Sequence, residues 1–455
     1  MKRALAWFRR DLRITDNTAL WAAVRQAAEV VPVYILSEWS GLHRWTGANR
    51  QQFLCGCLSS LAQNLRAIGG WLTIRRGSAV QELAKLANEI GAQAIFFNRD
   101  PDPFGRQIEG ELFAFGEKAG VEIVGFNDAT VHEPGEVLNS SGEPFRVFTA
   151  YARAWVKAGK VKPQGRVHTF KVPEGVASLP LPTLATWGLQ PEADVLEAGE
   201  KAARTRMKRF IEHGLASYGR LRNSLAGEFT SRLSQDLRFG LLSIRELLER
   251  CQERAALLSA GARKNAEKFI SELIWREFYF SILWHYPEVL DIEFNPKFRG
   301  MKWPGTRVHF DRWRAGETGF PIVDAAMRQL AQTGFMPNRA RMIVAMFLTK
   351  DLLVDWRLGE SYFMQKLTDG EIASNNGGWQ WSAGTGADAA PYFRILNPWT
   401  QSARCDPDGE YVKQWVPELR SVATQCLHES PPSGERLAPD YPAPLVDHAR
   451  SREEA

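Results

Sequence analysis

Two asparagines and two glycines directly precede a pair of tryptophans in one stretch of this 455-residue chain. The stretch runs from Leu367 to Pro398 and reads LTDGEIASNNGGWQWSAGTGADAAPYFRILNP, with Trp379 and Trp381 two positions apart. Glycine lets a backbone approach a bound molecule closely, and asparagine supplies hydrogen-bond donors and an acceptor. The composition therefore favours a ligand-binding segment, and the alternative interpretation is a tight structural turn anchored by a tryptophan.

A second polar group, Thr230 to Ser234, reads TSRLS and precedes a predicted helix. Hydroxyls, a guanidinium and free helix N–H groups suit an anion such as a phosphate. The same residues are also typical of an ordinary helix N-cap, which is the alternative.

Glu272 and Trp275 are three positions apart in a predicted helix, so both side chains can line one cavity. The chain holds 16 tryptophans, and a surplus of this kind is often a matter of core packing. The spacing alone leaves both interpretations open for Trp275.

The elements that must hold these residues fall into two groups. The first 130 residues alternate short apolar segments with amphipathic helices, which predicts an α/β domain with a doubly wound parallel sheet, Rossmann-like in its layers. The strands are expected at 4–8, 30–36, 71–75, 94–98 and 121–126, and the helices at 20–28, 49–68, 80–90 and 108–119. The loop after the first strand reads FRRDLRITDN and lacks a glycine-rich dinucleotide fingerprint. We interpret it as a charged loop in which Thr15 or Asp16 caps a helix.

A connector is expected at 131–198, because residues 169–194 are rich in proline and glycine and lack periodicity. Residues 199–430 show helical periodicity and predict an all-helical domain. Its helices are expected at 204–212, 243–258, 262–285, 321–333, 338–353 and 359–367. Residues 431–455 form a polar, proline-rich tail that we expect to be poorly ordered.

The net charge of +5, from 57 basic and 52 acidic residues, permits a nucleic-acid partner without requiring one. Five cysteines without CxxC spacing, and a start that does not read as a secretory signal, favour a reducing cytosol and no structural zinc. Apolar runs stay well short of the roughly 20 residues of a membrane span. We therefore expect a cytoplasmic monomer, in a bacterial cytosol, without membrane association.

The chain resembles the cryptochrome/photolyase family from Ala4 to about Leu419. The Leu367–Pro398 stretch resembles the flavin-binding signature of that family, and WFRRDLRITDNTAL resembles its N-terminal signature. Further motifs follow in the family's order: WREFYF at 275–280, TGFPIVDAAMRQL at 318–330 and NRARMIVAMFLTKDLLVDWRLGE at 338–360. The resemblance implies an N-terminal α/β antenna domain, a long connector and an all-helical FAD-binding domain.

Within the family the chain is most similar to class I cyclobutane pyrimidine dimer photolyases. Asn375 stands at the position of the flavin N5 partner, as in photolyases, whereas plant and animal cryptochromes carry Asp or Cys there. Asn338 and Met342 stand where (6-4) photolyases have two histidines. A (6-4) photolyase is therefore disfavoured, and a cryptochrome-type blue-light receptor without repair activity remains the alternative, although such receptors often have a longer tail.

The resemblance implies a deoxyribodipyrimidine photo-lyase, a carbon–carbon lyase that acts in DNA repair. Light excites fully reduced FAD, and one electron passes to a flipped-out pyrimidine dimer in single- or double-stranded DNA. The cyclobutane ring opens and the electron returns to the flavin. One FAD per chain is implied, and damaged DNA is the partner.

The family's functional residues carry over by position, with two departures: Glu371 stands where Asp is expected, and Phe269 where the best-known members have Trp. An ion pair between Arg341 and Asp369 is expected beside the isoalloxazine. The implied FAD contacts are Tyr218, Thr230, Ser231, Arg232, Leu233, Ser234, Phe269, Arg341, Asp369, Gly370, Glu371 and Asn375. The implied substrate and DNA contacts are Arg222, Glu272, Trp275, Asn338, Arg339, Met342 and Trp381. The implied catalytic residues are Glu272, Asn375 and an electron relay of Trp379, Trp356 and Trp303, ordered outward from FAD.

A second, light-harvesting chromophore is a further implication. The segment Asn98 to Gln107 reads NRDPDPFGRQ, and Gly105 stands where folate-binding members carry an acidic residue. The segment looks more like members that bind a deazaflavin or a flavin. A folate and an empty antenna site remain alternatives.

Overall fold

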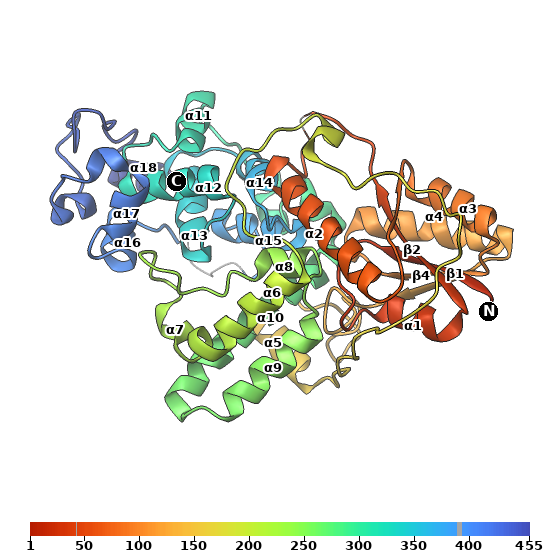
Figure 1. Cartoon of the computed structure of the whole chain (residues 1–455). Helices are drawn as coiled ribbons and strands as arrows, with labels where there is room; N and C mark the ends of the chain where they lie inside the picture. The colour runs from red at the N-terminus through yellow and green to blue at the C-terminus, as the bar shows by residue number, and fades with distance from the viewer. Residues whose placement is uncertain (42, 389–393) are drawn as a thin grey trace.

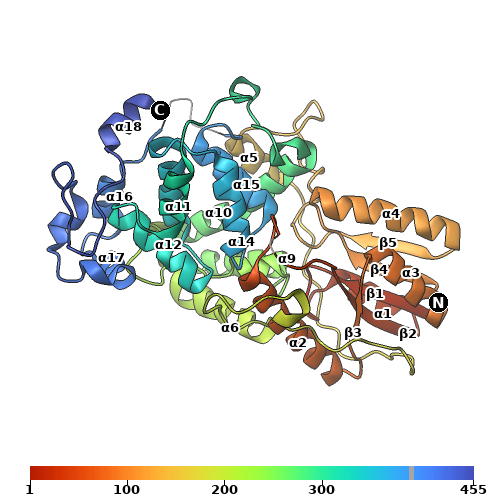
Figure 2. The same ribbon diagram turned by 90° about the horizontal axis from the view of Figure 1, so that it is seen from above.

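The structure is a computed structural model that describes residues 1–41, 43–388 and 394–455. Residues 389–393, in the AGTGADAAPYFRILNP motif, lie outside the described residues. A parallel sheet flanked by helices forms one end of the molecule and a body of helices the other (Figure 1). The view from above shows the same division (Figure 2). Among the described residues, no helix is long and apolar enough to cross a membrane.

The N-terminal sheet has five parallel strands in the order β3-β2-β1-β4-β5, which confirms the predicted fold class. Its elements are β1 (Arg3–Phe8), α1 (Thr18–Gln26), β2 (Glu29–Leu36), α2 (Ala48–Ala67), β3 (Thr73–Arg76), α3 (Ala79–Ile90), β4 (Ala94–Asn98), α4 (Pro103–Ala119) and β5 (Glu122–Phe126). Alternate residues of β1 enter different cores: Leu5 and Trp7 pack with side chains of α3 and α4, and Ala6 and Phe8 pack with those of α1 and α2. Burial on both faces explains why the strands read as continuous apolar runs.

The six predicted helices of the helical domain correspond to α6, α9, α10, α12, α13 and α14, whereas α7, α11 and α15–α18 were not predicted. The predicted helix 338–353 is α13 followed by a π-helical turn, and the next helix begins at Trp356 rather than at residue 359. The helices before residue 260 are α5 (Phe148–Lys157), η1 (Leu184–Trp187), α6 (Glu200–Arg209), η2 (Phe210–Gly214), η3 (Leu215–Ser217), α7 (Tyr218–Leu221), α8 (Ser234–Arg238) and α9 (Ile244–Ala256). Those after it are α10 (Ala260–His285), η4 (Pro287–Leu290), η5 (Pro296–Phe298), α11 (Arg307–Ala315), α12 (Pro321–Thr333), α13 (Asn338–Met346), η6 (Phe347–Asp351), α14 (Trp356–Lys366), α15 (Ile372–Ala383), α16 (Pro398–Cys405), α17 (Glu410–Trp415), η7 (Pro417–Leu419), η8 (Thr424–His428) and α18 (His448–Glu454).

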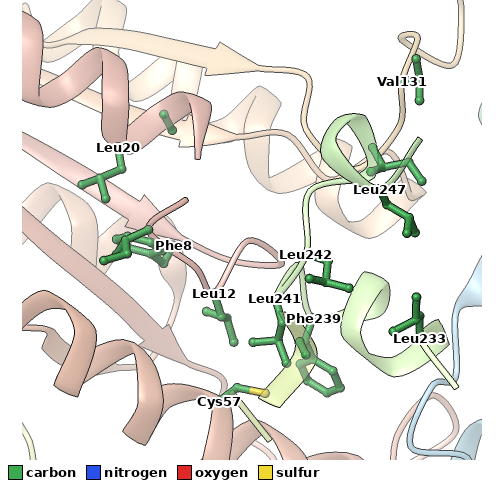
Figure 3. Close-up of a cluster of buried hydrophobic side chains, with 14 of the residues drawn as sticks. Phe8, Leu12, Leu20, Cys57, Val131, Leu233, Phe239, Leu241, Leu242 and Leu247 are labelled. Atoms are coloured by element: carbon green, nitrogen blue, oxygen red, sulfur yellow. The ribbon is translucent and has the colours of Figure 1, made fainter. Parts of the chain in front are cut away.

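One hydrophobic cluster runs from the sheet into the helical domain without interruption. Phe8 and Leu12 belong to the same buried cluster as Phe239, Leu241 and Leu242 (Figure 3). The backbone N–H of Leu12 also donates to the carbonyl of Phe239 at 3.1 Å. The shared core means that the sheet and the helices are held in one fixed arrangement.

The FRRDLRITDN loop lies at this contact. The prediction that Thr15 or Asp16 caps a helix is wrong, because Asn17 is the cap of α1 and accepts the N–H of Leu20 at 3.0 Å. Asp16 has a positive φ of 49° and instead accepts hydrogen bonds from Ser243 and Arg245 of the helical domain. The carboxylate is thus used for tertiary contact rather than for local capping.

Asp128 is the centre of a buried group of charges at the same contact. Arg13 Nη2 and Arg245 Nη2 each lie 2.7 Å from Asp128 Oδ1. Burial would raise the pKa of Asp128, but the two guanidiniums outweigh it and hold that pKa below its ordinary value. Arg13 of the loop after β1 and Arg245 of α9 therefore share the carboxylate of Asp128.

The expectation that the tail, residues 431–455, is poorly ordered is wrong. Tyr441 is completely buried, and its hydroxyl donates to the buried carboxylate of Asp324. His448 Nδ1 lies 2.5 Å from Asp351 Oδ1. The composition of these 25 residues is polar as a whole, and it gave no sign of the few side chains that anchor the segment.

We predict that Asp128→Asn lowers the free energy of unfolding at pH 7 by about 3 kcal/mol or more, since two buried guanidiniums lose their shared charge partner. A pKa that is lower in the folded protein than the unfolded value of about 3.9 stabilises fully above that value, and the effect declines as the pH falls below it. The gap in urea midpoint between wild type and variant should stay constant down to about pH 5 and narrow below about pH 4.

The exposed Asp408→Asn is the matched control and should leave the midpoint unchanged. Equal midpoints of wild type and Asp128→Asn at pH 7 would contradict the prediction.

Candidate active site

A cavity of about 590 Å³ opens within the helical domain. It is lined by side chains of α7, α8, α10, α13, α14 and α15 and by the loops before α8, α13 and α15. The lining combines charged groups with aromatic rings, which suits a ligand that has both polar and apolar parts.

All residues expected to contact FAD line this cavity. They are Tyr218, Thr230, Ser231, Arg232, Leu233, Ser234, Phe269, Arg341, Asp369, Gly370, Glu371 and Asn375. All residues expected to contact substrate and DNA line it as well, namely Arg222, Glu272, Trp275, Asn338, Arg339, Met342 and Trp381. Segments that are far apart in the chain thus meet in one site.

Two buried acceptors mark the part of the cavity formed by the loop before α15. Arg341 Nη2 lies 2.7 Å from Asp369 Oδ2, so the expected ion pair is present, while Asp369 Oδ1 and Glu371 Oε1 have no hydrogen-bond partner. A Cβ placed on Gly378 would meet nothing within 4 Å, so the lining leaves room beside α15. Unpaired buried acceptors require donors, and a flavin with its ring N–H and ribityl hydroxyls supplies them.

Arg232 and the neighbouring hydroxyls form the second polar part of the cavity. Its backbone has a positive φ of 52°, burial lowers its guanidinium pKa, and its Nε has no hydrogen-bond partner. The acidic side chain of Glu228 approaches to 3.6 Å but is 71% exposed. Because α8 is only five residues long, the hydroxyls and Arg232 rather than a helix terminus are the groups suited to a phosphate.

Glu371, the first departure from the family, connects the cavity to the sheet domain. Its carboxylate pairs with Arg10 of the FRRDLR loop and lies 3.6 Å from Arg276. Arg10 Nη1 also lies 2.7 Å from Asp100 Oδ1. Arg10, in the loop after β1, therefore contacts a residue that lines the cavity.

Arg50, Arg238 and Arg276 are buried near Glu371, with few carboxylates to balance their charges. Burial lowers the pKa of Arg50 to about 9 and that of Arg276 to about 10. Arg50 and Arg238 both donate to the carbonyl of Gly370, at 2.9 and 3.0 Å. A surplus of buried positive charge favours an anionic ligand beside Gly370.

Glu272 and Trp275, both on α10, line the cavity, an arrangement that their spacing allows. Glu272 pairs with Arg222, and Lys268 Nζ lies 3.5 Å from its carboxylate. Asn375 donates to the carbonyl of Glu360 at 3.1 Å. Arg339 Nε donates to Asn223 Oδ1 at 3.1 Å.

The three relay tryptophans belong to one hydrophobic cluster, but only Trp379 is among the residues that line the cavity. The ring of Trp379 packs against Gly359, which is on the same face of α14 as Trp356. Trp356 is fully buried and donates Nε1–H to Glu293 Oε1 at 3.3 Å. Trp303 is half-buried in the loop before α11.

Gly105 lies in the first turn of α4, directly against Asp100. A Cβ at this position would come within 3.0 Å of both the side chain and the carbonyl of Asp100, and Asp102 caps the helix through the N–H of Gly105 at 2.7 Å. A glycine here is therefore a packing requirement of this chain. The identity of an antenna chromophore stays a prediction.

Sequence reasoning missed several groups that shape the site. Arg276 follows Trp275 in the WREFYF motif, and its position four residues after Glu272 could have indicated it. Phe363 and Trp313 pack against Trp379 at ring-centroid distances of 5.0 and 6.0 Å. Arg10 carries no local signal, because its partner Glu371 is 361 positions away.

Comparison with protein families assigns both halves of the chain. A model described as DNA photolyase matches residues 4–174, and a model described as the FAD binding domain of DNA photolyase matches residues 269–455. The second match continues past Leu419, where the sequence motifs had suggested that the likeness ends.

Curated relatives cover nearly the whole chain. Deoxyribodipyrimidine photo-lyase of Halobacterium salinarum is 38% identical over 99% of this chain and 97% of its own length. The protein of the same name from Synechococcus sp. is 38% identical over 98% of this chain and 93% of its own length.

Solved structures of three other proteins share the fold over nearly the whole chain. A bacterial class III photolyase from Agrobacterium tumefaciens has a TM-score of 0.92 and 35% identity, covering 100% of this chain and 96% of that one. An archaeal photolyase from Sulfolobus tokodaii with two FAD molecules has a TM-score of 0.86 and 30% identity, covering 99% and 98%. A cryptochrome from Synechocystis sp. has a TM-score of 0.90 and 28% identity, covering 100% and 98%.

We predict that Arg232→Met weakens FAD binding about 10- to 100-fold, the loss expected for one or two hydrogen bonds from a charged donor. The measurement is titration of the FAD-free protein with FAD, followed by flavin fluorescence. Arg66→Met, at an exposed position of α2, is the matched control and should bind FAD like the wild type. An unchanged FAD affinity of Arg232→Met would remove this residue from the site.

Proposed function

Because the chain belongs to the DNA photolyase family, we propose that it repairs cyclobutane pyrimidine dimers in DNA in a light-driven reaction at the cavity described above. It is a flavoprotein lyase with the family's FAD-binding domain. Its curated relatives at 38% identity are named deoxyribodipyrimidine photo-lyase. The observation that carries the proposal is that the residues expected to bind FAD and those expected to bind the lesion line the same cavity.

The residues suited to holding FAD lie at two places in the cavity. Asp369, Glu371 and Asn375 would meet the ring system, and Arg232 with its hydroxyl neighbours would meet the pyrophosphate. When bound, FAD supplies the light-excited electron that splitting of the dimer requires. The buried arginines around Gly370 favour a negatively charged reduced flavin.

The lesion would enter the cavity between Trp275 and Trp381. A pyrimidine dimer stacks and pairs poorly within a duplex, so extruding it costs less than extruding a normal base pair. Trp275 offers a stacking surface, and Glu272 offers a carboxylate to the base edges. Asn338 and Met342, at the same cavity, lack the acid–base chemistry that two histidines provide.

Arg222 and Glu272 suggest how DNA prepares the site. Their ion pair satisfies both charges in the protein alone. A DNA phosphate would compete for Arg222 and leave Glu272, with the half-exposed Lys268 as its remaining partner, available to accept hydrogen bonds from the bases. The expected DNA contact at Arg222 and the expected base contact at Glu272 would then be linked.

The route for photoreduction would follow Trp379, Trp356 and Trp303. The carboxylate of Glu293 accepts the indole N–H of Trp356 and also pairs with Arg357, whose guanidinium lies 4.7 Å from the centre of the Trp356 ring. This route would bring the flavin to its reduced state and would not take part in repair itself.

A cryptochrome-type receptor is the second candidate, because the Synechocystis cryptochrome shares the fold over the whole chain. Asn375 at the flavin and the Glu272–Trp275 pair favour the repair enzyme. We place the chain with class I enzymes because its AGTGADAAPYFRILNP segment resembles theirs, and we treat it as a cytoplasmic monomer. For the antenna we favour a flavin or deazaflavin, in line with the second FAD of the Sulfolobus tokodaii photolyase.

We predict that the FAD-loaded, prereduced protein removes thymine dimers from a defined oligonucleotide under blue light and leaves them intact in the dark. Chromatography of the digested oligonucleotide measures the loss. The same oligonucleotide with a (6-4) photoproduct is the matched control and should stay unrepaired. Light without any dimer loss would favour the receptor over the enzyme.

We predict that Trp356→Phe slows photoreduction of oxidised FAD about ten-fold or more, equivalent to about 1.4 kcal/mol in barrier, because phenylalanine is much harder to oxidise. Repair by prereduced enzyme should be unchanged. Absorbance of oxidised flavin under illumination follows the first reaction. Trp187→Phe, at a buried tryptophan outside this cluster, is the control. Photoreduction at the wild-type rate in Trp356→Phe would exclude this residue from the route.

A further inference from the structure

Phe148, the first residue of α5, lies flat against Trp275. The two ring centroids are 3.7 Å apart and the planes differ by 8°, a face-to-face stack. Trp275 lines the cavity, whereas Phe148 is not among the lining residues. Phe148 therefore covers the indole face that is turned away from the cavity.

Two hydrogen bonds fix the segment that carries Phe148. The N–H of Phe148 donates to Asp388 Oδ1 at 3.1 Å, and the N–H of Asp388 donates to the carbonyl of Arg146 at 3.2 Å. Asp388 has a positive φ of 53°, a conformation that glycine, asparagine and aspartate adopt more readily than most other residues. We call this pair of bonds the 146–148/388 clasp. It joins the connector to the segment that follows α15.

The stack limits the motion of Trp275. A tryptophan side chain turns about two bonds, and each rotamer presents a different surface to the cavity. With Phe148 behind it, and the rings of Phe278 and Tyr279 beside it at centroid distances of 5.7 and 5.6 Å, the indole has little room to turn. A ring that is already ordered loses less entropy when a ligand stacks on it.

We propose that Phe148 is a positioning residue that holds Trp275 ready to stack on an extruded dimer, and that the 146–148/388 clasp makes the connector part of the lesion site. The inference rests on the proposed function, because it assumes that Trp275 contacts the lesion. Phe148 would act on lesion affinity through Trp275 and would leave the flavin site untouched.

The experiment compares FAD-loaded wild type, Phe148→Ala, Phe148→Leu and Phe148→Tyr in the dark. Each binds a labelled oligonucleotide with one thymine dimer, and its undamaged counterpart, at fixed salt. For Phe148→Ala we expect about ten-fold weaker binding of the dimer, the loss of roughly one aromatic pair. Binding of undamaged DNA, bound FAD and the repair rate at saturating substrate should stay at wild-type values. A higher KM with unchanged kcat is the signature of this role.

Two further variants separate stacking from mere packing. Phe148→Leu retains most of the apolar volume without a flat ring and should bind the dimer as weakly as Phe148→Ala, which also covers the case in which the alanine variant fails to fold. Phe148→Tyr keeps the ring and should retain wild-type affinity. Val147→Ala, at the exposed neighbouring position, is the matched control.

The possible outcomes test the role of Phe148 separately from the proposed repair of dimers. A wild type that does not distinguish dimer from undamaged DNA would overturn the proposed function. A wild type that distinguishes them, with Phe148→Ala and Phe148→Leu binding the dimer equally well, would overturn the role of Phe148 alone. Joint loss of FAD and dimer affinity in both variants would also overturn it, because general packing would then explain the effect.

Discussion

The pairing of buried arginines in the loop after β1 is the constraint on which the rest of the structure depends. A buried guanidinium is costly unless carboxylates surround it, and the partners of Arg10 come from both domains: Asp100 from the sheet and Glu371 from the cavity wall. Arg13 meets Asp128, which Arg245 of α9 shares. These charges can be satisfied together only when the sheet and the helices dock in one way. The shape of the cavity follows from that docking, because Glu371 is at once a docking partner and a wall of the site.

Local sequence patterns predicted the elements well and the contacts between them poorly. The parallel strands were visible because burial on both faces leaves continuous apolar runs, and the helix predicted at 262–285 corresponds to α10. Asp16 was misassigned as a helix cap because its actual partners, Ser243 and Arg245, are more than 220 positions away. The packed tail was missed because its anchors, Tyr441 and His448, are isolated side chains within a polar segment.

The candidate site was predicted as a set of residues but not as an arrangement. Family motifs indicated which side chains belong together, and the cavity contains them. Motifs could not show that Glu272 is paired with Arg222, that Trp275 is backed by Phe148, or that Glu371 reaches Arg10. Each of these is a contact between segments that are distant in the chain, and each changes what the residue can do. The carboxylate of Glu272 already has a partner, the ring of Trp275 is held in place, and Glu371 is bound to the sheet domain.

The Arg10–Glu371 pair also limits how freely the two halves of such a chain can be recombined. A sheet domain that docked through hydrophobic surface alone would be an exchangeable module. Here the sheet domain places a charged group directly behind the wall of the catalytic cavity, and Gly240 leaves no room for a side chain where it meets the backbone of Arg10. A domain transplanted from a relative would therefore need matching residues at positions 10, 100, 240 and 371.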